Sequence, residues 1–221
     1  TPQIFKKESL EIALNLMTKQ NLSFTDESQA MERAGFKIKE FSGERSNLKI
    51  TFADDIPLNV DNNYRVGRGV DFHRFEPGEG ITLGDVFIDC NLSIVAYSDG
   101  DIVLHALSDA LLGAGGLKDI GFYFPDTDIK NKDLSSVKIL EESLSLLKKK
   151  NLQPHNIDFV VVCEQPKIQP YVESLKKSLS SILNIDECCI GVKATTAEGM
   201  GIIGEGNGIA VFAIASLENA Q

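Results

Sequence analysis

The stretch from Val66 to His105, VGRGVDFHRFEPGEGITLGDVFIDCNLSIVAYSDGDIVLH, decides how this chain is organised. Asp71 and His73 lie near its start, two residues apart, and His105 closes it. Side chains two apart on a strand point to the same face, and the Asp-rich turn before His105 opens a helical pattern. One carboxylate and two imidazoles that converge can hold Zn²⁺ and leave a fourth position open, as catalytic zinc sites do.

An alternative interpretation is a surface Asp-x-His pair beside an unrelated helix histidine, because short motifs match by chance. The chain has only 3 histidines, and two of them belong to this pattern. The third, His155, lies in a Gln-Pro-His-Asn sequence that is typical of a solvated loop. The scarcity of histidine therefore favours the zinc site.

Composition places the chain among globular proteins and argues against a nucleic-acid partner. Its 221 residues suit one domain, or one domain with an appendage. The net charge of −10 is the reverse of the basic excess that nucleic-acid binding requires. The 4 cysteines form no Cys-x-x-Cys pair, so neither a zinc finger nor a disulfide framework is indicated. No apolar run reaches the roughly 18 residues that a membrane span needs.

The chain divides at about residue 62. Residues 1–62 carry one helical pattern, over 8–19, and no recognisable motif. We interpret them as an N-terminal extension, either a linker or the remnant of a processed leader. Residues 63–221 form the predicted functional domain.

Hydrophobic periodicity in this domain predicts strands and helices in mixed order. The predicted strands cover 64–71, a hairpin over 81–88, 157–163, 190–196 and 209–216, and the predicted helices cover 99–112, 135–150 and a segment ending at 183. This order indicates an α+β fold, an α/β layer in which a mixed β-sheet is covered by helices on one face. The other face would be apolar, so we expect a homo-oligomer with the sheets facing inward.

Two smaller patterns have definite interpretations. Residues 199–204 match Gly-x-Gly-x-x-Gly, but a strand rather than a helix is predicted to follow, which argues against a dinucleotide site. Asp109 lies four residues after His105, on the same helix face. We predict that its carboxylate holds the second nitrogen of His105; a plain surface charge is the alternative.

Several separated motifs together resemble the 2-C-methyl-D-erythritol 2,4-cyclodiphosphate synthase family. They occur in that family's order and spacing: Asp71-Phe72-His73, Ser98-Asp99-Gly100-Asp101 through His105, Asp119-Ile120-Gly121, Phe124-Pro125-Asp126, Pro166-Lys167 and Lys193-Ala194-Thr195-Thr196-Ala197-Glu198. The resemblance covers about residues 64–217. Agreement of several motifs is far more specific than any one of them.

The resemblance implies a homotrimer, with its sheets facing the central axis and its active sites between neighbouring subunits. It implies Zn²⁺ held by Asp71, His73 and His105, and a second divalent cation, Mg²⁺ or Mn²⁺, bound through Glu198. The substrate would be 4-diphosphocytidyl-2-C-methyl-D-erythritol 2-phosphate, and the products the cyclic diphosphate and CMP. The implied substrate-binding residues are Ser98, Asp119, Gly121, Asp126, Pro166, Lys167, Ile168, Ala194, Thr195 and Thr196.

The implied reaction is attack of the 2-phosphate on the β-phosphorus of the same molecule. Both groups are anionic, so two cations and correct positioning supply most of the catalysis. Thr196 and Lys167 could donate to phosphate oxygens as charge develops, and Glu198 would hold the second ion. No covalent nucleophile is needed. A zinc hydrolase with Glu198 as its acid–base group is one alternative, and a trimer that binds nucleotide without turnover is another.

Three positions depart from the family pattern. The family usually has His before the Ser-Asp-Gly-Asp run, where this chain has Tyr97. Its Gly-rich turn often carries Arg and Glu, where this chain has Glu205 and Asn207. Three copies of Glu205 around a trimer axis would repel an anion, so we expect no isoprenoid diphosphate there.

The extra N-terminal residues led us to expect a plastid, specifically apicoplast, protein. They look too short for the cytidylyltransferase that is fused upstream in some bacterial relatives. A bacterial cytoplasm is the alternative location.

Overall fold

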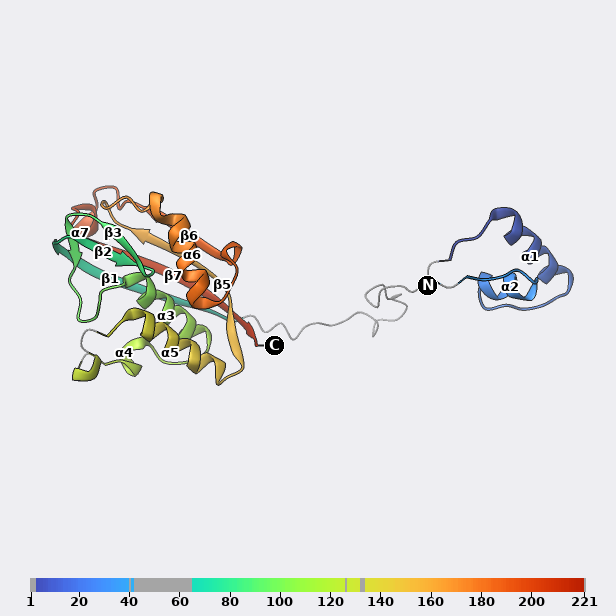
Figure 1. Ribbon diagram of the computed structural model, residues 1–221, viewed down its shortest axis with the longest axis horizontal. Coiled ribbons are helices and arrows are strands. Elements are labelled where there is room, and N and C mark those ends of the chain that lie inside the picture. The colour runs from blue at the N-terminus through green and yellow to red at the C-terminus, as the bar shows by residue number, and fades with distance from the viewer. Residues whose placement is uncertain (1–2, 40, 42–64, 126, 132–133, 221) are drawn as a thin grey trace. The chain divides into compact units, whose positions relative to one another are not determined.

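A computed structural model describes residues 3–39, 41, 65–125, 127–131 and 134–220. The chain forms two compact units, Thr1–Asn59 and Val60–Gln221 (Figure 1). In the first unit, α1 (Lys7–Lys19) confirms the predicted helix, and α2 (Glu27–Arg33) follows it. The buried apolar residues of this unit are Ala13, Met17, Ala30 and Met31.

The second unit is built on a five-stranded sheet with the strand order β4-β1-β7-β5-β6. The bounds are β1 Arg65–Pro77, β4 Leu92–Ile94, β5 Leu152–Val162, β6 Ile190–Thr195 and β7 Gly208–Asn219. The β5–β6 pair is parallel and the other pairs are antiparallel, so the sheet is mixed, as predicted. A separate hairpin pairs β2 (Gly80–Leu83) with β3 (Val86–Asp89), also as predicted.

Three helices cover one face of the sheet: α3 (Ile102–Ala114), α5 (Ser136–Lys148) and α6 (Val172–Leu183) (Figure 1). Helix α3 is buried on nearly all sides because it lies between the sheet and α5. Leucines spaced four residues apart, Leu175, Leu179 and Leu183, place one stripe of α6 in the same core. The predicted arrangement, with helices on one face, is confirmed.

Glycines set the distance between β1 and α3. A Cβ on Gly67 would lie 2.0 Å from the Ala110 backbone oxygen, and one on Gly69 would lie 1.9 Å from the Ala106 backbone oxygen. Only a residue without a side chain lets the strand approach the helix this closely. This approach brings the β1 residues that follow Gly69 within reach of side chains on the first turn of α3.

The opposite face of the sheet is open and apolar. Val66 is 66% exposed, Phe72 59%, Phe212 43% and Ile214 48%. The Phe72 and Phe212 rings meet edge to face, with centroids 5.8 Å apart. We call these four residues the open face.

Some element boundaries differ from the predicted ones. Strand β1 runs past residue 71 to Pro77, because it pairs with β7 as far as Arg74–Gly208 and with β4 from Phe75 to Pro77. Strand β7 runs to Asn219, where it pairs with Leu152 on β5. The short β4 was not predicted. One helical turn, α7 (Gly201–Gly204), lies in the Gly-rich segment where no helix was expected.

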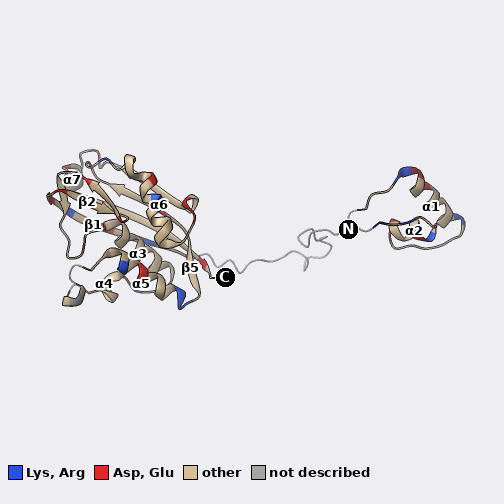
Figure 2. Ribbon diagram, viewed as in Figure 1, with Lys and Arg blue, Asp and Glu red and all other residues tan. Residues whose placement is uncertain are grey.

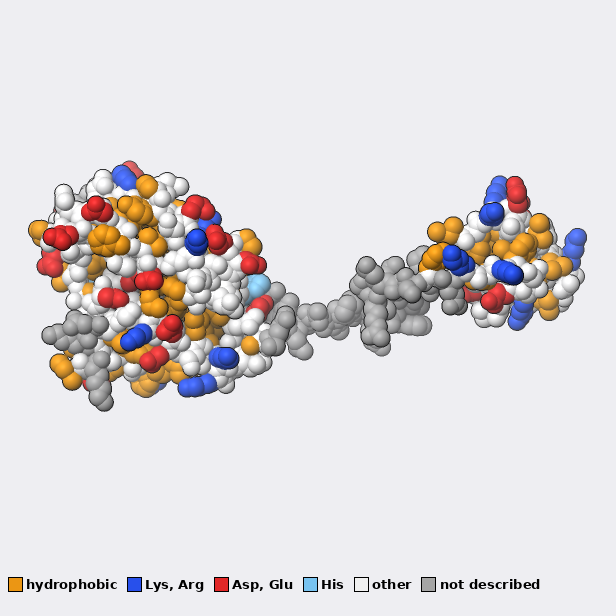
Figure 3. All heavy atoms as spheres, viewed as in Figure 1, with side chains coloured by type: hydrophobic (Ala, Val, Ile, Leu, Met, Phe, Trp, Pro, Cys, Tyr) orange, Lys and Arg blue, Asp and Glu red, His pale blue; other side chains and the backbone are white. Residues whose placement is uncertain are grey.

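Charges of both signs are spread over the helices rather than collected by sign (Figure 2). On the face drawn in Figure 3 they alternate with hydrophobic side chains. Within the described part of the chain, no helix combines the length and the apolar character that a membrane crossing requires.

Asp101 connects the start of α3 to the β2–β3 hairpin. It is 1% exposed, and its carboxylate accepts the N–H groups of Gly84 (2.8 Å), Asp85 (2.8 Å) and Leu104 (3.1 Å). Burial raises its pKa from 3.8 to about 6, although the three N–H donors act in the opposite direction. The folded protein therefore holds this proton more tightly than the unfolded chain does.

A pH dependence of stability follows from Asp101. The stabilisation is fully present below about pH 4 and is lost as the pH rises through 6, a change of about 3 kcal/mol at roughly 1.36 kcal/mol per pKa unit. Asp101→Asn cannot titrate, and its amide would oppose one N–H donor. We expect the variant to be less stable than the wild type, by a margin that narrows from pH 4 to pH 7. Urea unfolding across this range measures the margin; a constant margin would contradict the prediction.

Candidate active site

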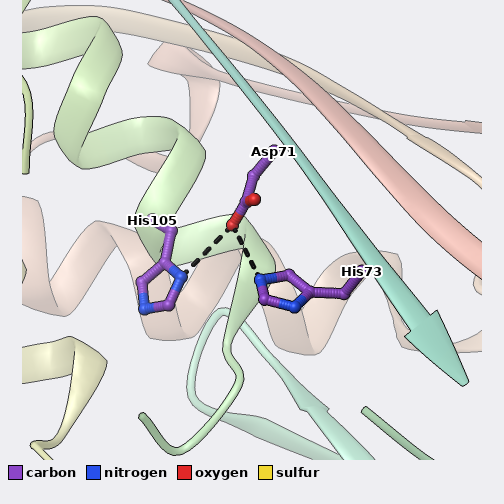
Figure 4. Close-up of side chains that lie close together, drawn as sticks. All are labelled: Asp71, His73 and His105. Carbon is purple, nitrogen blue, oxygen red and sulfur yellow. Dashed lines mark hydrogen bonds and ion pairs between the residues drawn. The ribbon is translucent and has the colours of Figure 1, made fainter. Parts of the chain in front are cut away.

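Asp71, His73 and His105 converge on one point beside the end of β1 (Figure 4). Asp71 Oδ2 lies 3.3 Å from His73 Nε2 and 3.2 Å from His105 Nδ1. All three donor atoms lie within 4.8 Å of one another. The edge of a tetrahedron with metal–ligand bonds of about 2.0–2.1 Å is roughly 3.3 Å. The two measured distances match this edge, so the donor set fits a zinc ion.

The backbone fixes the orientation of His73. Its Nδ1–H donates to the Val95 carbonyl oxygen at 2.9 Å, so the neutral ring presents the Nε2 lone pair to Asp71. A lone pair facing a carboxylate oxygen needs a cation between them, either a proton or a metal ion. The hydrogen bond to Asp71 raises the pKa of His73, although burial opposes this effect.

The charge of Asp71 is held by its two neighbours. Burial by itself raises the pKa of Asp71, but hydrogen bonds with His105 and His73, and the charges of these rings, outweigh it and keep the pKa well below its usual range. Asp71 is therefore ionised at neutral pH, as a metal ligand must be.

A pocket of about 420 Å³ opens beside these three residues. The same pocket is lined by Ser98, Gly121, Tyr97 and Asp109, each of which was singled out in the sequence. Tyr97 is 44% exposed, so its phenol ring stands at the pocket edge. Asp119 instead caps the short helix α4 (Ile120–Tyr123), accepting the Phe122 N–H at 2.9 Å. Asp126, which the sequence analysis also gives as a substrate-binding residue, lies outside the described residues.

The prediction for Asp109 is wrong. Its carboxylate accepts the Ile120 N–H at 2.8 Å instead of holding His105. Helical spacing correctly placed Asp109 near the pocket, because the Asp109 side chain lines that pocket. However, the start of α4 presents a backbone donor to Asp109.

Ser136 contacts the His105 nitrogen that faces away from Asp71, and Asp99 contacts Ser136. The sequence predicted neither of these contacts. Ser136 Oγ lies 2.9 Å from His105 Nε2, and Ser98 Oγ lies 3.2 Å from the same atom. Ser136 also bonds to both carboxylate oxygens of Asp99. Ser136 lies on the first turn of a helix, where serine is an ordinary capping residue, so its sequence context carried no signal.

A second group of predicted residues lies where β5 and β6 end. It consists of Pro166, Lys167, Ile168, Ala194, Thr195, Thr196 and Glu198. The Cys163 N–H donates to the Thr195 carbonyl oxygen at 3.1 Å, and the Ala197 N–H donates to Glu164 Oε1 at 3.0 Å. These two bonds join the loop after β5 to the loop after β6.

The predicted catalytic residues belong to this second group. Thr196 Oγ1 donates to Glu198 Oε1 at 2.6 Å, and Lys167 Nζ donates to the Glu164 carbonyl oxygen at 3.3 Å. Glu198 has a φ of +52°, a left-handed conformation that is uncommon outside glycine. Strained backbone of this kind concentrates at functional sites.

The two groups are separated within one chain. Phe72 on β1 pairs with Ala210 on β7, which in turn pairs with Val162 on β5. Val162 then pairs with Thr195 on β6. Three strand spacings of about 4.8 Å put Thr195 roughly 14 Å from β1. Residues paired across strands share a face, so Thr195 lies on the Phe72 side of the sheet and His73 on the other.

Comparison with known proteins identifies two segments. Residues 64–218 match the model of the YgbB family, and residues 1–60 match that of 2-C-methyl-D-erythritol 4-phosphate cytidylyltransferase. The expectation that the N-terminal segment is too short to belong to such a cytidylyltransferase is therefore wrong. Residues 1–62 show one predicted helix and no motif, which is too little to reveal a family.

Three relatives illustrate the similarity. The 2-C-methyl-D-erythritol 2,4-cyclodiphosphate synthase of Leptospira borgpetersenii is 50% identical over 67% of this chain and 94% of its own. The bifunctional enzyme IspD/IspF of Desulforudis audaxviator is 36% identical over 98% of this chain, which spans 56% of that protein. The structure of IspF from Plasmodium falciparum in complex with CDP is 38% identical, covers 72% of this chain and 99% of its own, and has a TM-score of 0.64.

Proposed function

Because this chain belongs to the YgbB family of 2-C-methyl-D-erythritol 2,4-cyclodiphosphate synthases, we propose that its residues 63–221 convert 4-diphosphocytidyl-2-C-methyl-D-erythritol 2-phosphate to the cyclic diphosphate and CMP. The observation that carries the proposal is the convergence of Asp71, His73 and His105. The enzyme would be a phosphorus–oxygen lyase of the non-mevalonate route to isoprenoids.

Asp71, His73 and His105 would hold Zn²⁺ beside the pocket. The bound ion would polarise a phosphate oxygen and offset the repulsion between the two anionic groups. Ser98 and Gly121 line the same pocket and would orient the methylerythritol end. Asp119 and Asp126 stay proposed contacts by resemblance.

Thr196, Lys167 and Glu198 would act at the other end of the substrate. The Thr196 hydroxyl and the Lys167 ammonium would donate to phosphate oxygens, and the Glu198 carboxylate would hold Mg²⁺ or Mn²⁺ together with the substrate. Pro166, Ile168, Ala194 and Thr195 would form the cytidine pocket. A relative bound to CDP supports a cytidine diphosphate ligand.

We propose that each active site combines two copies of the chain in a homotrimer. Two observations support shared sites. Thr195 lies about 14 Å from β1, which carries two of the proposed zinc ligands, and on the opposite face of the sheet from His73. The open face also exposes four large hydrophobic side chains that a partner would cover.

Phe212→Asp tests the role of the open face. A buried, unpaired carboxylate at each interface costs several kcal/mol, so we expect the variant to elute as the 24.2 kDa monomer and to lose CMP release. Light scattering gives the mass. Phe87→Asp is the control, because Phe87 is 62% exposed on β3, away from the open face. An oligomeric, active Phe212→Asp variant would contradict the shared-site proposal.

Turnover separates the proposed reaction from its alternatives. Purified protein with Zn²⁺ and Mg²⁺ is expected to release CMP, and phosphorus NMR should show a cyclic diphosphate. A linear product would indicate a zinc hydrolase instead. Absence of CMP in the presence of bound nucleotide would indicate a protein that binds without catalysing.

The N-terminal segment carries a second proposal, since residues 1–60 match a cytidylyltransferase family. The chain spans 56% and 59% of two bifunctional relatives that it matches. We propose that this segment serves the cytidylyltransferase step in a bifunctional protein, which pyrophosphate release from CTP and methylerythritol 4-phosphate would test. Those relatives, which match nearly all of this chain, are bacterial. They do not support a plastid location, so we propose the bacterial cytoplasm instead.

A further inference from the structure

We infer that Ser136 and Asp99 are positioning residues that decide which nitrogen of His105 carries the proton, and so keep Nδ1 free for the metal. The inference rests on the zinc site of the proposed function. It depends on contacts behind His105, on the side away from Asp71.

The contacts form a series of hydrogen bonds that runs from Asp99 through Ser136 to His105. Ser136 is 0% exposed and His105 8% exposed, so water does not compete for these bonds. The Ser136 N–H donates to Asp99 Oδ2 at 2.9 Å, and the Ser136 hydroxyl makes a short hydrogen bond to Asp99 Oδ1. Ser136 Oγ then lies 2.9 Å from His105 Nε2.

The number of available protons fixes which atom donates and which accepts in each of these hydrogen bonds. A serine hydroxyl has one proton to donate, and an ionised carboxylate can only accept. The hydroxyl proton of Ser136 is therefore used on Asp99, and its oxygen can only accept from His105. It follows that Nε2 of His105 carries a proton.

The consequence appears at the opposite nitrogen. With the proton on Nε2, the neutral ring presents the lone pair of Nδ1 to Asp71 Oδ2, 3.2 Å away. A lone pair and a carboxylate at this distance require a cation between them. Histidine ligands of metals are commonly oriented in this way by a partner on the other nitrogen.

Ser98 shares His105 Nε2 at 3.2 Å, but it has a different place in the network. Its Oγ accepts the Gly100 N–H at 3.3 Å, and among the described residues no carboxylate contact fixes the direction of its own proton. Ser98 can accept from Nε2 as well, but only Ser136 is tied to a carboxylate. We therefore assign the choice of tautomer to Ser136 and Asp99.

The first measurement is the tautomer itself. Long-range proton–nitrogen NMR of the metal-free wild type at pH 8 is expected to show a proton on Nε2 of His105, whether or not a second proton takes the place of the metal ion between Nδ1 and Asp71. In Asp99→Asn the new amide can donate to Ser136, which frees the hydroxyl to donate to Nε2, so the proton is expected to move to Nδ1. A wild-type His105 that carries its proton on Nδ1 alone would overturn the inference, and so would an unchanged spectrum in Asp99→Asn.

The second measurement is zinc affinity, by competition with a chelator. Ser136→Ala and Asp99→Asn are expected to weaken binding by about 10–100-fold. Saturating zinc should restore CMP release to within about twofold of the wild type, which a general loss of folding would not allow. Ser108→Ala is the matched control, because Ser108 is also 0% exposed, lies on α3, and its hydroxyl has no partner in the described structure.

The outcomes separate this inference from the proposed function. A wild type that binds no zinc would overturn the proposed metal site, whereas the tautomer measured without metal would still stand. A wild type that binds zinc, with Ser136→Ala binding equally well, would overturn the inference alone. Where Ser136→Ala does not fold, Asp99→Asn and the wild-type spectrum decide.

Discussion

Asp71→Asn is expected to lose tight zinc binding and to lower kcat/KM for CMP release by at least about 10³-fold. A single oxygen, Oδ2, lies within 3.3 Å of both imidazole donor atoms, so this change removes the anionic centre of the donor set. Polarisation by a bound ion contributes several kcal/mol, and each 1.36 kcal/mol corresponds to about tenfold in rate. Metal content and CMP release measured on the same preparation test the prediction.

His155→Ala is the control for loss of a histidine–carboxylate contact. His155 lies 3.0 Å from Glu218, on β5 rather than beside the pocket. We expect this variant to bind zinc and to turn over like the wild type. Turnover in Asp71→Asn within tenfold of the wild type would remove zinc as the centre of the reaction.

Gly69→Ala is expected to have the largest effect on stability, lowering the free energy of unfolding by about 3 kcal/mol or more. Its Cβ would lie 1.9 Å from the Ala106 oxygen and 2.8 Å from the Ala110 nitrogen. Both are backbone atoms, so no side-chain rotation relieves the clash, and β1 must move away from α3. Asp71 is two residues further on, so zinc affinity should fall as well. Urea unfolding and chelator competition measure the two effects.

Gly113→Ala separates this clash from the general effect of adding a methyl group. Gly113 lies in α3, and the nearest atom to its added Cβ would be the Gly67 Cα, 4.0 Å away. Alanine favours a helix over glycine by up to about 1 kcal/mol, so we expect no loss of stability or a small gain. Equal stabilities of Gly69→Ala and Gly113→Ala would show that β1 and α3 are not held by close contact.

The convergence of Asp71, His73 and His105, the proposed zinc ligands, was predictable from the sequence because each position rests on a local rule. Alternation along a strand put Asp71 and His73 on one face, and the Asp-rich turn indicated the helix that carries His105. The helix-covered mixed sheet followed in the same way from periodicity. Strand ends were less predictable, since β1 extends through pairing with β7, more than 130 residues later, and its last three residues pair with the short β4.

Contacts behind the site were beyond the reach of sequence spacing. Asp109 has the right helical offset to support His105, but a backbone N–H from α4 binds it instead. The group that does contact His105 Nε2, Ser136, lies 31 residues away in sequence. Local periodicity relates residues that lie within a few helical turns of one another. It does not reveal which helix, distant in sequence, begins next to a given side chain.

By itself, the sequence of this protein determined its layered sheet, its candidate metal ligands and its family resemblance, because these follow from short-range alternation and motif order. Only the tertiary structure decided how β1 reaches α3 through Gly67 and Gly69, that Ser136 lies behind His105, and that Thr195 and His73 lie on opposite faces of the sheet. These features depend on packing between segments far apart in the chain, where steric contact and the pairing of buried polar groups select the partners.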